Sequence, residues 1–191
     1  MRTEVVQPSR HLPARPTVAA GRRIAWRCGP SDEVEPHLLG AASPASRASK
    51  RVLVVDDESS IRMLCRVNLA ASGIEVLEAD NGCDGVELVR REQPDLVLLD
   101  VMMPGLDGWE VAQRLAADPK TSRIPIVFLT ARAGEEDRRL GEELGGVGYV
   151  VKPFDPVQIG NLVEEVLTRI ELGERDALRR GILDGLLEPP S

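Results

Sequence analysis

Three acidic residues, a hydroxyl and a lysine each follow an apolar run of the chain. Asp56 and Asp57 come directly after one run, Asp100 after another, and Thr130 and Lys152 end two more. Three carboxylates in one pocket repel and raise each other's pKa unless a cation offsets their charge. Mg²⁺ suits such a group, because it binds through one or two carboxylates, phosphate oxygens and water. A carboxylate there can attack a phosphorus centre, so the residue types indicate formation of an aspartyl phosphate.

These side chains can act together only if the apolar runs bring them to one edge. The runs have strand length and alternate with segments of helical period, which predicts strands buried on both faces of a parallel sheet. Strands are expected at 52–55, 75–79, 96–99, 126–129 and 149–151, and helices near 59–72, 83–92, 108–117, 135–144 and 156–170. The alternation predicts an α/β fold of right-handed βα units. Ligands of such a sheet bind beyond the carboxyl ends of its strands, where the five side chains should gather.

Five motifs in this order and spacing resemble the receiver domain of two-component response regulators. They read VLVVDDE at 52–58, DLVLLD at 95–100, MMPG at 102–105, IVFLTA at 126–131 and YVVKPF at 149–154. The resemblance covers residues 51–171 and implies a flavodoxin-like (βα)5 doubly wound parallel sheet with strand order 2-1-3-4-5. A stand-alone, single-domain response regulator is expected.

The resemblance assigns the acidic residues their roles. Asp100 is the expected phosphorylation site; capping of the next helix is better assigned to Asp107, which lies closer to it. Asp57 and Asp100 are the expected direct Mg²⁺ ligands, with the backbone carbonyl of Met102 as a third. Asp56 is expected to act on the metal mainly through water.

The resemblance also assigns a switch. Lys152 is expected to pair with Asp100 and then with phosphoryl oxygens, and the family has a cis peptide bond at Lys152–Pro153. The Thr130 hydroxyl is expected to donate to a phosphoryl oxygen. As Thr130 moves, the Tyr149 ring is expected to turn inward and change a surface on the fourth helix, fifth strand and fifth helix.

Other positions bear on signal lifetime and on assembly. Met102 and Arg132, two residues after Asp100 and Thr130, are expected to hinder water and slow hydrolysis of the phosphoryl group. The glycine-rich segment 144–148 departs from the family and predicts a looser loop. The segment 155–159 lacks the charged pattern of members that dimerise, so dimerisation is left open.

The charge and the cysteine content of the chain limit the classes of function that are possible. The net charge of −7 divides into +4 over residues 1–50 and −11 over residues 51–191, which argues against non-specific nucleic-acid binding by the folded domain. No apolar run approaches the roughly 18 residues of a membrane helix. The three cysteines, Cys28, Cys65 and Cys83, form no C-x-x-C pair, which is typical of free thiols in a reducing cytoplasm. Cys65 lies in a helical apolar pattern and is expected to be a buried hydrophobe.

The chain is expected to divide into three segments: an extension, a folded domain and a tail. Residues 1–49 are proline-rich and predict a disordered N-terminal extension, although a start site placed too far upstream explains them equally well. Residues 50–171 are the expected receiver domain. Residues 172–191 form a short tail with leucines at helical spacing, and docking on the body is favoured over a partner-binding helix.

The expected partners follow from the resemblance. A sensor histidine kinase or phosphotransfer protein would donate the phosphoryl group in the cytoplasm, with no direct nucleic acid or membrane contact, and the downstream effector is unknown. The protein is expected to be a phospho-accepting signalling domain that assists its own phosphorylation and dephosphorylation, not an enzyme. A dehalogenase-type phosphotransferase is disfavoured because its Asp-x-Asp motif is missing, and no phosphate-binding glycine motif follows a strand. A transcription factor with DNA contacts in the basic N-terminus remains a weaker alternative.

Overall fold

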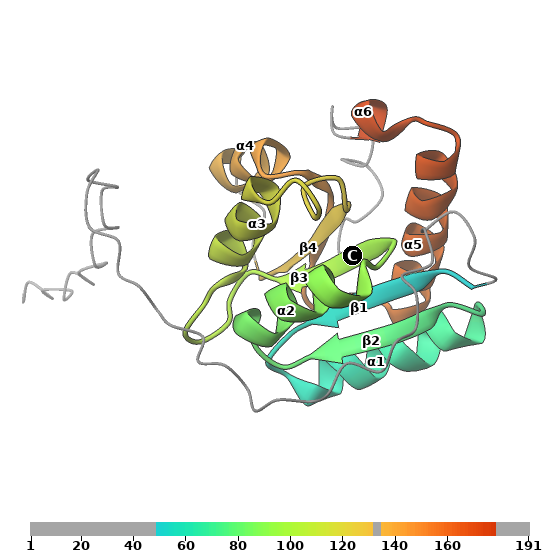
Figure 1. Cartoon of the computed structure of the whole chain (residues 1–191). Coiled ribbons are helices and arrows are strands. Elements are labelled where there is room, and N and C mark those ends of the chain that lie inside the picture. The colour runs from blue at the N-terminus through green and yellow to red at the C-terminus, as the bar shows by residue number, and fades with distance from the viewer. Residues whose placement is uncertain (1–48, 132–134, 179–191) are drawn as a thin grey trace, which may run out of the picture. The chain divides into compact units, whose positions relative to one another are not determined.

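The computed structural model describes residues 49–131 and 135–178, with five strands that alternate with helices (Figure 1). The strands are β1 Arg51–Val55, β2 Glu75–Ala79, β3 Leu96–Asp100, β4 Ile126–Thr130 and β5 Gly146–Val151. The helices are α1 Ser59–Ala71, α2 Gly82–Glu92, α3 Gly108–Ala117, α4 Glu135–Glu143, α5 Pro156–Glu171 and the short α6 Arg175–Ala177. Residues 1–48 and 179–191, with most of the expected extension and tail, lie outside the described residues, as does Arg132.

The strands form one parallel sheet in the order β2-β1-β3-β4-β5, which confirms the flavodoxin-like prediction. Every residue of β3 and β4 is buried. Their apolar runs are continuous, not alternating, because helices cover both faces of the sheet. Strand β2 lies at an edge, where the exposed Glu75 and Glu78 discourage pairing with another strand.

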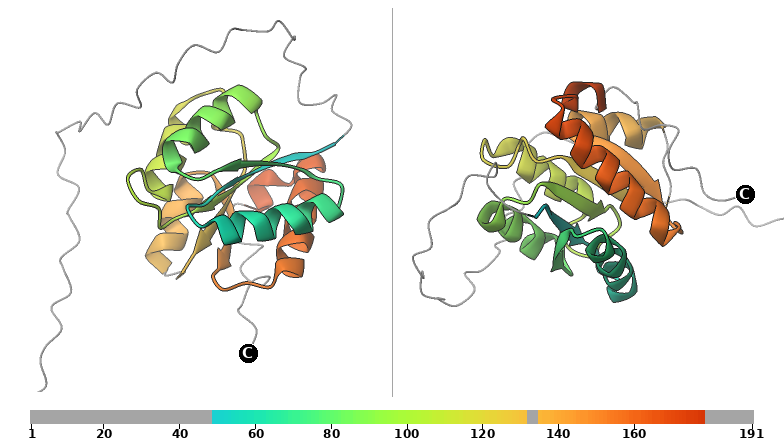
Figure 2. Two further views of the ribbon diagram at one scale, coloured as in Figure 1. Left: turned by 90° about the horizontal axis from the view of Figure 1, so that it is seen from below. Right: turned by 90° about the vertical axis from the view of Figure 1, so that its right-hand side faces the viewer.

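Helices lie on both faces of the sheet (Figure 2). Two separate apolar clusters hold them there. Cys65, which is fully buried as expected, belongs to the cluster beneath α1 and α5. The apolar face of α5 supplies five buried side chains to that cluster: Ile159, Leu162, Val163, Val166 and Leu167. The other cluster lies beneath α2 and α3 and includes Phe128 of β4. The sheet is therefore packed between two layers of helices. The polar side chains of the expected site lie at the carboxyl ends of its strands, outside these apolar clusters.

Local signals set the helix ends near the site. Asp107 caps α3 through a capping box with Glu110, so the expected capping role of Asp107 is confirmed. Asp155 caps α5 just ahead of Pro156, whose fixed φ suits the first helical position. Gly73 follows the end of α1 with φ of +76°, as expected of a helix stop.

The glycine-rich segment before Tyr149 differs from the expectation. Strand β5 begins at Gly146, and Gly146, Val147 and Gly148 are buried within it, so the prediction of a loose loop over 144–148 was wrong for its second half. A Cβ on Gly146 would lie 2.8 Å from the Gly141 carbonyl oxygen and 2.8 Å from Phe128 Cε2. The glycine lets the strand pack closely against α4 and β4, which local sequence could not indicate.

Candidate functional site

The carboxyl ends of β1 and β3 bring Asp56, Asp57 and Asp100 together. Each offers a carboxylate oxygen, and these atoms all lie within 4.8 Å of one another. Asp56 is fully buried and Asp100 is 3% exposed, whereas Asp57 is exposed. The three acids thus form a cluster with two buried members and one exposed member. We call this cluster, Asp56, Asp57 and Asp100, the acidic cup.

Lys152 closes this cup from the end of β5. Its Nζ lies 2.7 Å from Asp56 Oδ2 and 3.1 Å from Asp100 Oδ1, and its side chain is 15% exposed. The peptide bond between Lys152 and Pro153 is cis, as expected. One ammonium therefore bridges the two buried acids, with Glu58 further off at 3.9 Å.

The electrostatics of the pair follow from its burial. Burial raises the pKa of Asp56, and the hydrogen bonds from Lys152 and the Glu58 amide only partly counteract it. Burial also acts to lower the pKa of Lys152, but hydrogen bonding and charge attraction from Asp56, with Asp100, outweigh it and raise that pKa. Lys152 therefore stays charged, whereas burial makes the ionised form of Asp56 less favourable.

The donor set fits a hard cation. The cluster has three carboxylates, and among the described residues Lys152 pairs with two of them, Asp56 and Asp100, so negative charge is in excess; oxygen is the ligand type that Mg²⁺ prefers. Asp57 and Asp100 are placed to hold such an ion, which would neutralise charge as a phosphoryl group arrives. Met102, whose backbone carbonyl is the third expected ligand, is 72% exposed.

Two further residues support the acidic cup, and the sequence reasoning missed them. Arg62 of α1 donates from Nη1 to the backbone carbonyls of Asp56 and Asp57, at 2.7 Å and 3.2 Å. The Glu58 amide donates to Asp56 Oδ1 at 2.9 Å. Glu58 could have been noticed because it adjoins the acid pair, but an arginine on an amphipathic helix carries no such signal.

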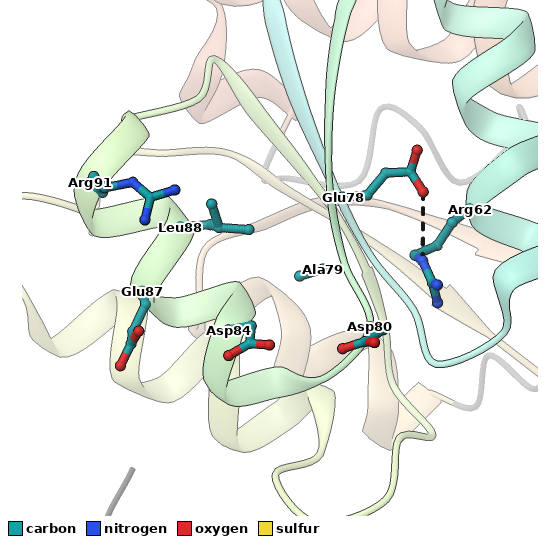
Figure 3. A pocket seen from close by; sticks show the side chains of 8 residues that line it. All are labelled: Arg62, Glu78, Ala79, Asp80, Asp84, Glu87, Leu88 and Arg91. Atoms are coloured by element: carbon teal, nitrogen blue, oxygen red, sulfur yellow. Dashed lines mark ion pairs between the residues drawn. The ribbon is translucent and has the colours of Figure 1, made fainter. Parts of the chain in front are cut away.

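Arg62 also lines a pocket between α1, β2 and α2 (Figure 3). Arg62 pairs there with Glu78, at 3.6 Å between Nε and Oε2. Figure 3 shows Leu88 and Arg91 of α2 on the opposite side. The remaining lining residues are Ala79, Asp80, Asp84 and Glu87. Two of these residues also contact the acidic cup: Arg62 through the carbonyls of Asp56 and Asp57, and Ala79, whose carbonyl accepts from the Asp56 amide at 3.2 Å.

The two expected switch residues lie on neighbouring strands. Thr130 ends β4, is 5% exposed, and its carbonyl accepts a bond from the Lys152 amide at 2.8 Å. Tyr149 of β5 pairs with Phe128, two residues before Thr130, and therefore lies deeper along the sheet. Its hydroxyl donates to the Asp137 carbonyl oxygen of α4 at 2.8 Å.

An aromatic row extends from this tyrosine into α3. The rings of Tyr149 and Phe128 stack with centroids 5.4 Å apart, and those of Phe128 and Trp109 are tilted at 4.7 Å. Contacts of this geometry add to the energy of simple burial. The row therefore connects β5, β4 and α3 through two ring contacts.

Comparison with known proteins identifies this arrangement. A family model described as response regulator receiver domain matches residues 52–164. The PhoP transcriptional regulatory protein of alkaline phosphatase synthesis, from Bacillus subtilis, is 43% identical over 65% of this chain and 51% of its own length. The phosphate regulon transcriptional regulatory protein PhoB of Pseudomonas aeruginosa is 41% identical over 67% of this chain and 56% of its own.

A solved structure agrees with these matches. The chemotaxis protein CheY4 of Vibrio cholerae superposes with a TM-score of 0.58 and 30% identity, over 64% of this chain and 99% of that one. The chain spans about half the length of the curated relatives it matches. Because those relatives are named transcriptional regulators, they do not support the expectations of a stand-alone regulator and of no direct nucleic-acid contact. The chain belongs to the response regulator receiver domain family, the phospho-accepting signalling domain of two-component phosphorelays.

Proposed function

We propose that Asp100 accepts a phosphoryl group from a sensor histidine kinase or a phosphotransfer protein. An Asp100 carboxylate oxygen attacks the phosphorus in line, the bond from phosphorus to the donor histidine breaks, and the imidazole keeps the electron pair. The observation that carries the proposal is Lys152 Nζ, held between Asp56 and Asp100 beside an open carboxylate cup. There it can stabilise negative charge on the phosphoryl oxygens during transfer.

Mg²⁺ is the cofactor proposed for this site. Asp57 and Asp100 would hold it directly together with the backbone carbonyl of Met102, and Asp56 would act through water. Arg62 and the Glu58 amide hold the Asp56–Asp57 turn in place for this role. The mutual separations within 4.8 Å and the excess of carboxylates support the assignment.

The phosphorylation site is tested with acetyl phosphate and Mg²⁺, followed by intact-protein mass measurement. The wild type should gain one phosphoryl group and Asp100→Asn none. Asp107→Asn is the matched control, because asparagine caps helices as well as aspartate does, so this variant should label normally. Labelling of Asp100→Asn at the wild-type level would refute the assignment.

The metal assignment is tested separately by Mg²⁺ titration followed through Trp109 fluorescence. Trp109 is the second residue of α3 and lies two residues after the capping residue Asp107. Asp57→Ala should weaken Mg²⁺ binding by about tenfold or more, as expected for loss of a direct ligand. Wild-type affinity in Asp57→Ala would show that Asp57 does not hold the ion.

The output is proposed to run through Thr130 and Tyr149 to α4, β5 and α5. The Thr130 hydroxyl donates to a phosphoryl oxygen, and Tyr149 transmits the resulting movement to α4 through its bond to the Asp137 carbonyl. Thr130→Ala should therefore accept phosphate while amide exchange in α4 and β5 no longer responds. A response equal to that of the wild type would remove Thr130 from the switch.

The names of the relatives favour control of transcription as the process served. The charge of −11 over residues 51–191 predicts weak binding of duplex DNA by the receiver itself. Binding of the full chain to DNA, measured by anisotropy at two salt concentrations with and without phosphorylation, tests where any DNA contact lies. Tight, salt-dependent binding would assign a contact to residues outside the receiver.

The cytoplasm is the proposed compartment, because the proposed phosphoryl donor acts there and the cysteine pattern suits a reducing environment. Within the described residues, the helices are all too short or too polar to cross a membrane.

A further inference from the structure

The Tyr149 ring and α4 approach each other more closely at Gly141 than any side chain would permit. A Cβ built on Gly141 would lie 1.6 Å from Tyr149 Oη, 2.7 Å from its Cζ and 3.0 Å from Phe128 Cε2. The first two separations are far below contact distance, so the ring and a side chain at position 141 cannot both occupy this space. Gly141 is buried in the last turn of α4, within the helix, where glycine lowers helix stability relative to alanine.

The ring is attached to the helix at the same place. The Tyr149 hydroxyl passes over Gly141 and donates to the carbonyl of Asp137, one turn earlier in α4. The face of the ring stacks on Phe128, which contacts Trp109 in turn. The ring is thus held by β4 on one side and by bare helix backbone on the other.

We propose that Gly141 is the positioning residue of the switch: its missing side chain creates the space in which the Tyr149 ring lies between α4 and Phe128. The inward position of the ring and the placement of α4 are therefore coupled. The ring can leave only by breaking its hydrogen bond to the Asp137 carbonyl of α4. Its departure would also leave an unfilled space between Gly141 and Phe128, so α4 would lose a packing contact. This inference rests on the proposed roles of Thr130 and Tyr149 and adds the residue that makes the coupling possible.

The position of the ring can be measured without phosphorylation. Tyr149 is the only tyrosine in the chain, so isotope-labelled tyrosine gives NMR signals from one ring. Because Tyr149 is half-buried, these signals should be partly shielded from a soluble paramagnetic agent in the wild type, and they should show contacts with Phe128. Gly141→Ala should expose the ring to the agent and change Trp109 fluorescence through the aromatic row.

Gly160→Ala is the matched control. Gly160 is also a buried helical glycine, in α5, but a Cβ there would meet nothing within 4 Å. The tyrosine signals of Gly160→Ala should match those of the wild type. If the ring in Gly141→Ala is as shielded as in the wild type, the proposal is overturned.

A double-mutant cycle separates positioning from a general packing defect. With Tyr149 present, Gly141→Ala should lower the urea midpoint of unfolding. In a Tyr149→Ala background the same change should raise the midpoint, because the space is open and alanine is the better helix former. If Gly141→Ala is equally damaging in both backgrounds, or fails to fold in both, position 141 has no specific relation to the ring and the proposal fails.

The signalling consequence has its own readout. Gly141→Ala should be phosphorylated by acetyl phosphate at a rate within about twofold of the wild type, since the site chemistry lies at the strand ends. Its α4 amide exchange should, however, no longer change on phosphorylation. Failure of the wild type to label would refute the proposed function, whereas the ring measurements above would still decide the role of Gly141.

Discussion

Lys152 is the residue on which the charge balance of the site depends. It contacts two carboxylates that are almost fully buried, and its own side chain is 15% exposed. Removing one partner of a buried ion pair leaves charge without compensation, which is more costly than never having buried the pair. The same ammonium thus serves the stability of the resting protein and the proposed transfer.

Lys152→Met should destabilise the metal-free protein by about 3–5 kcal/mol near neutral pH. The folded pKa of Lys152 is raised above its ordinary value of 10.5, so its stabilising contribution is present below pH 10.5. That contribution is lost as the pH rises through the folded pKa. Urea unfolding with a chelator should therefore show the gap between wild type and variant narrowing above pH 10.5. A gap that is constant with pH would contradict the ion-pair account.

Cys65 illustrates a titratable group that the site perturbs without using it. Burial, followed by the charge of Asp56, raises the pKa of its thiol to about 12. Because the thiolate is the reactive form, Cys65 should be inert to thiol reagents near neutral pH while the protein is folded.

A variant that retains only Cys65 should react with a thiol reagent only as fast as the protein unfolds. A variant that retains only Cys83, which is half-buried, is the comparison and should react about tenfold faster or more. Equal rates for the two variants in the absence of denaturant would show that Cys65 is accessible.

At the scale of elements, α3 is placed by one close contact with β3. A Cβ on Gly108, the first residue of α3, would lie 2.2 Å from the Asp100 carbonyl oxygen and 2.8 Å from Val101 Cα. The helix therefore begins directly against the backbone that presents the proposed phosphorylation site. The capping box formed by Asp107 holds it there.

Gly108→Ala should push α3 away from Asp100 and cost about 1–3 kcal/mol, the range for overpacking a close contact. Because the shift displaces the Asp100 backbone, the rate of labelling by acetyl phosphate should fall as well. Urea unfolding and the labelling rate measure the two effects, with Gly160→Ala as the glycine control. Unchanged values for both would mean that α3 does not position Asp100.

At the scale of the molecule, the segment after α5 contributes to the core. Leu178 follows α6, is 2% exposed and belongs to the apolar cluster beneath α1 and α5. Arg175 of α6 also donates to the Ser122 carbonyl at 3.5 Å, in the connection before β4. The folded body therefore continues at least to Leu178, past the end of α5.

Leu178→Ala should destabilise the protein by about 2–5 kcal/mol, because it leaves a cavity in that cluster. Leu172→Ala is the natural control, since Leu172 is 69% exposed and its loss should change stability by no more than about 0.5 kcal/mol. Equal urea midpoints for the two variants would show that Leu178 does not stabilise the core.

The sequence alone determined the features that are encoded locally along the chain. Continuous apolar runs and helical stripes predicted the alternation of elements, and the residue at each strand end predicted which side chains would meet. The resemblance to a family supplied the strand order, which the structure confirms. These predictions succeed because the period of a strand or helix, and the polarity of its last residue, depend on neighbours within one element.

Only the tertiary structure decided which side chains of different elements touch. The support of the acid pair by Arg62, the extension of β5 through Gly146 and the burial of Leu178 each depend on how one element packs against another. The fit of the Tyr149 ring over Gly141 is of the same kind. Such contacts depend on sheet register and on the approach of helix to strand to within a few ångströms. No periodicity along a single element carries that information.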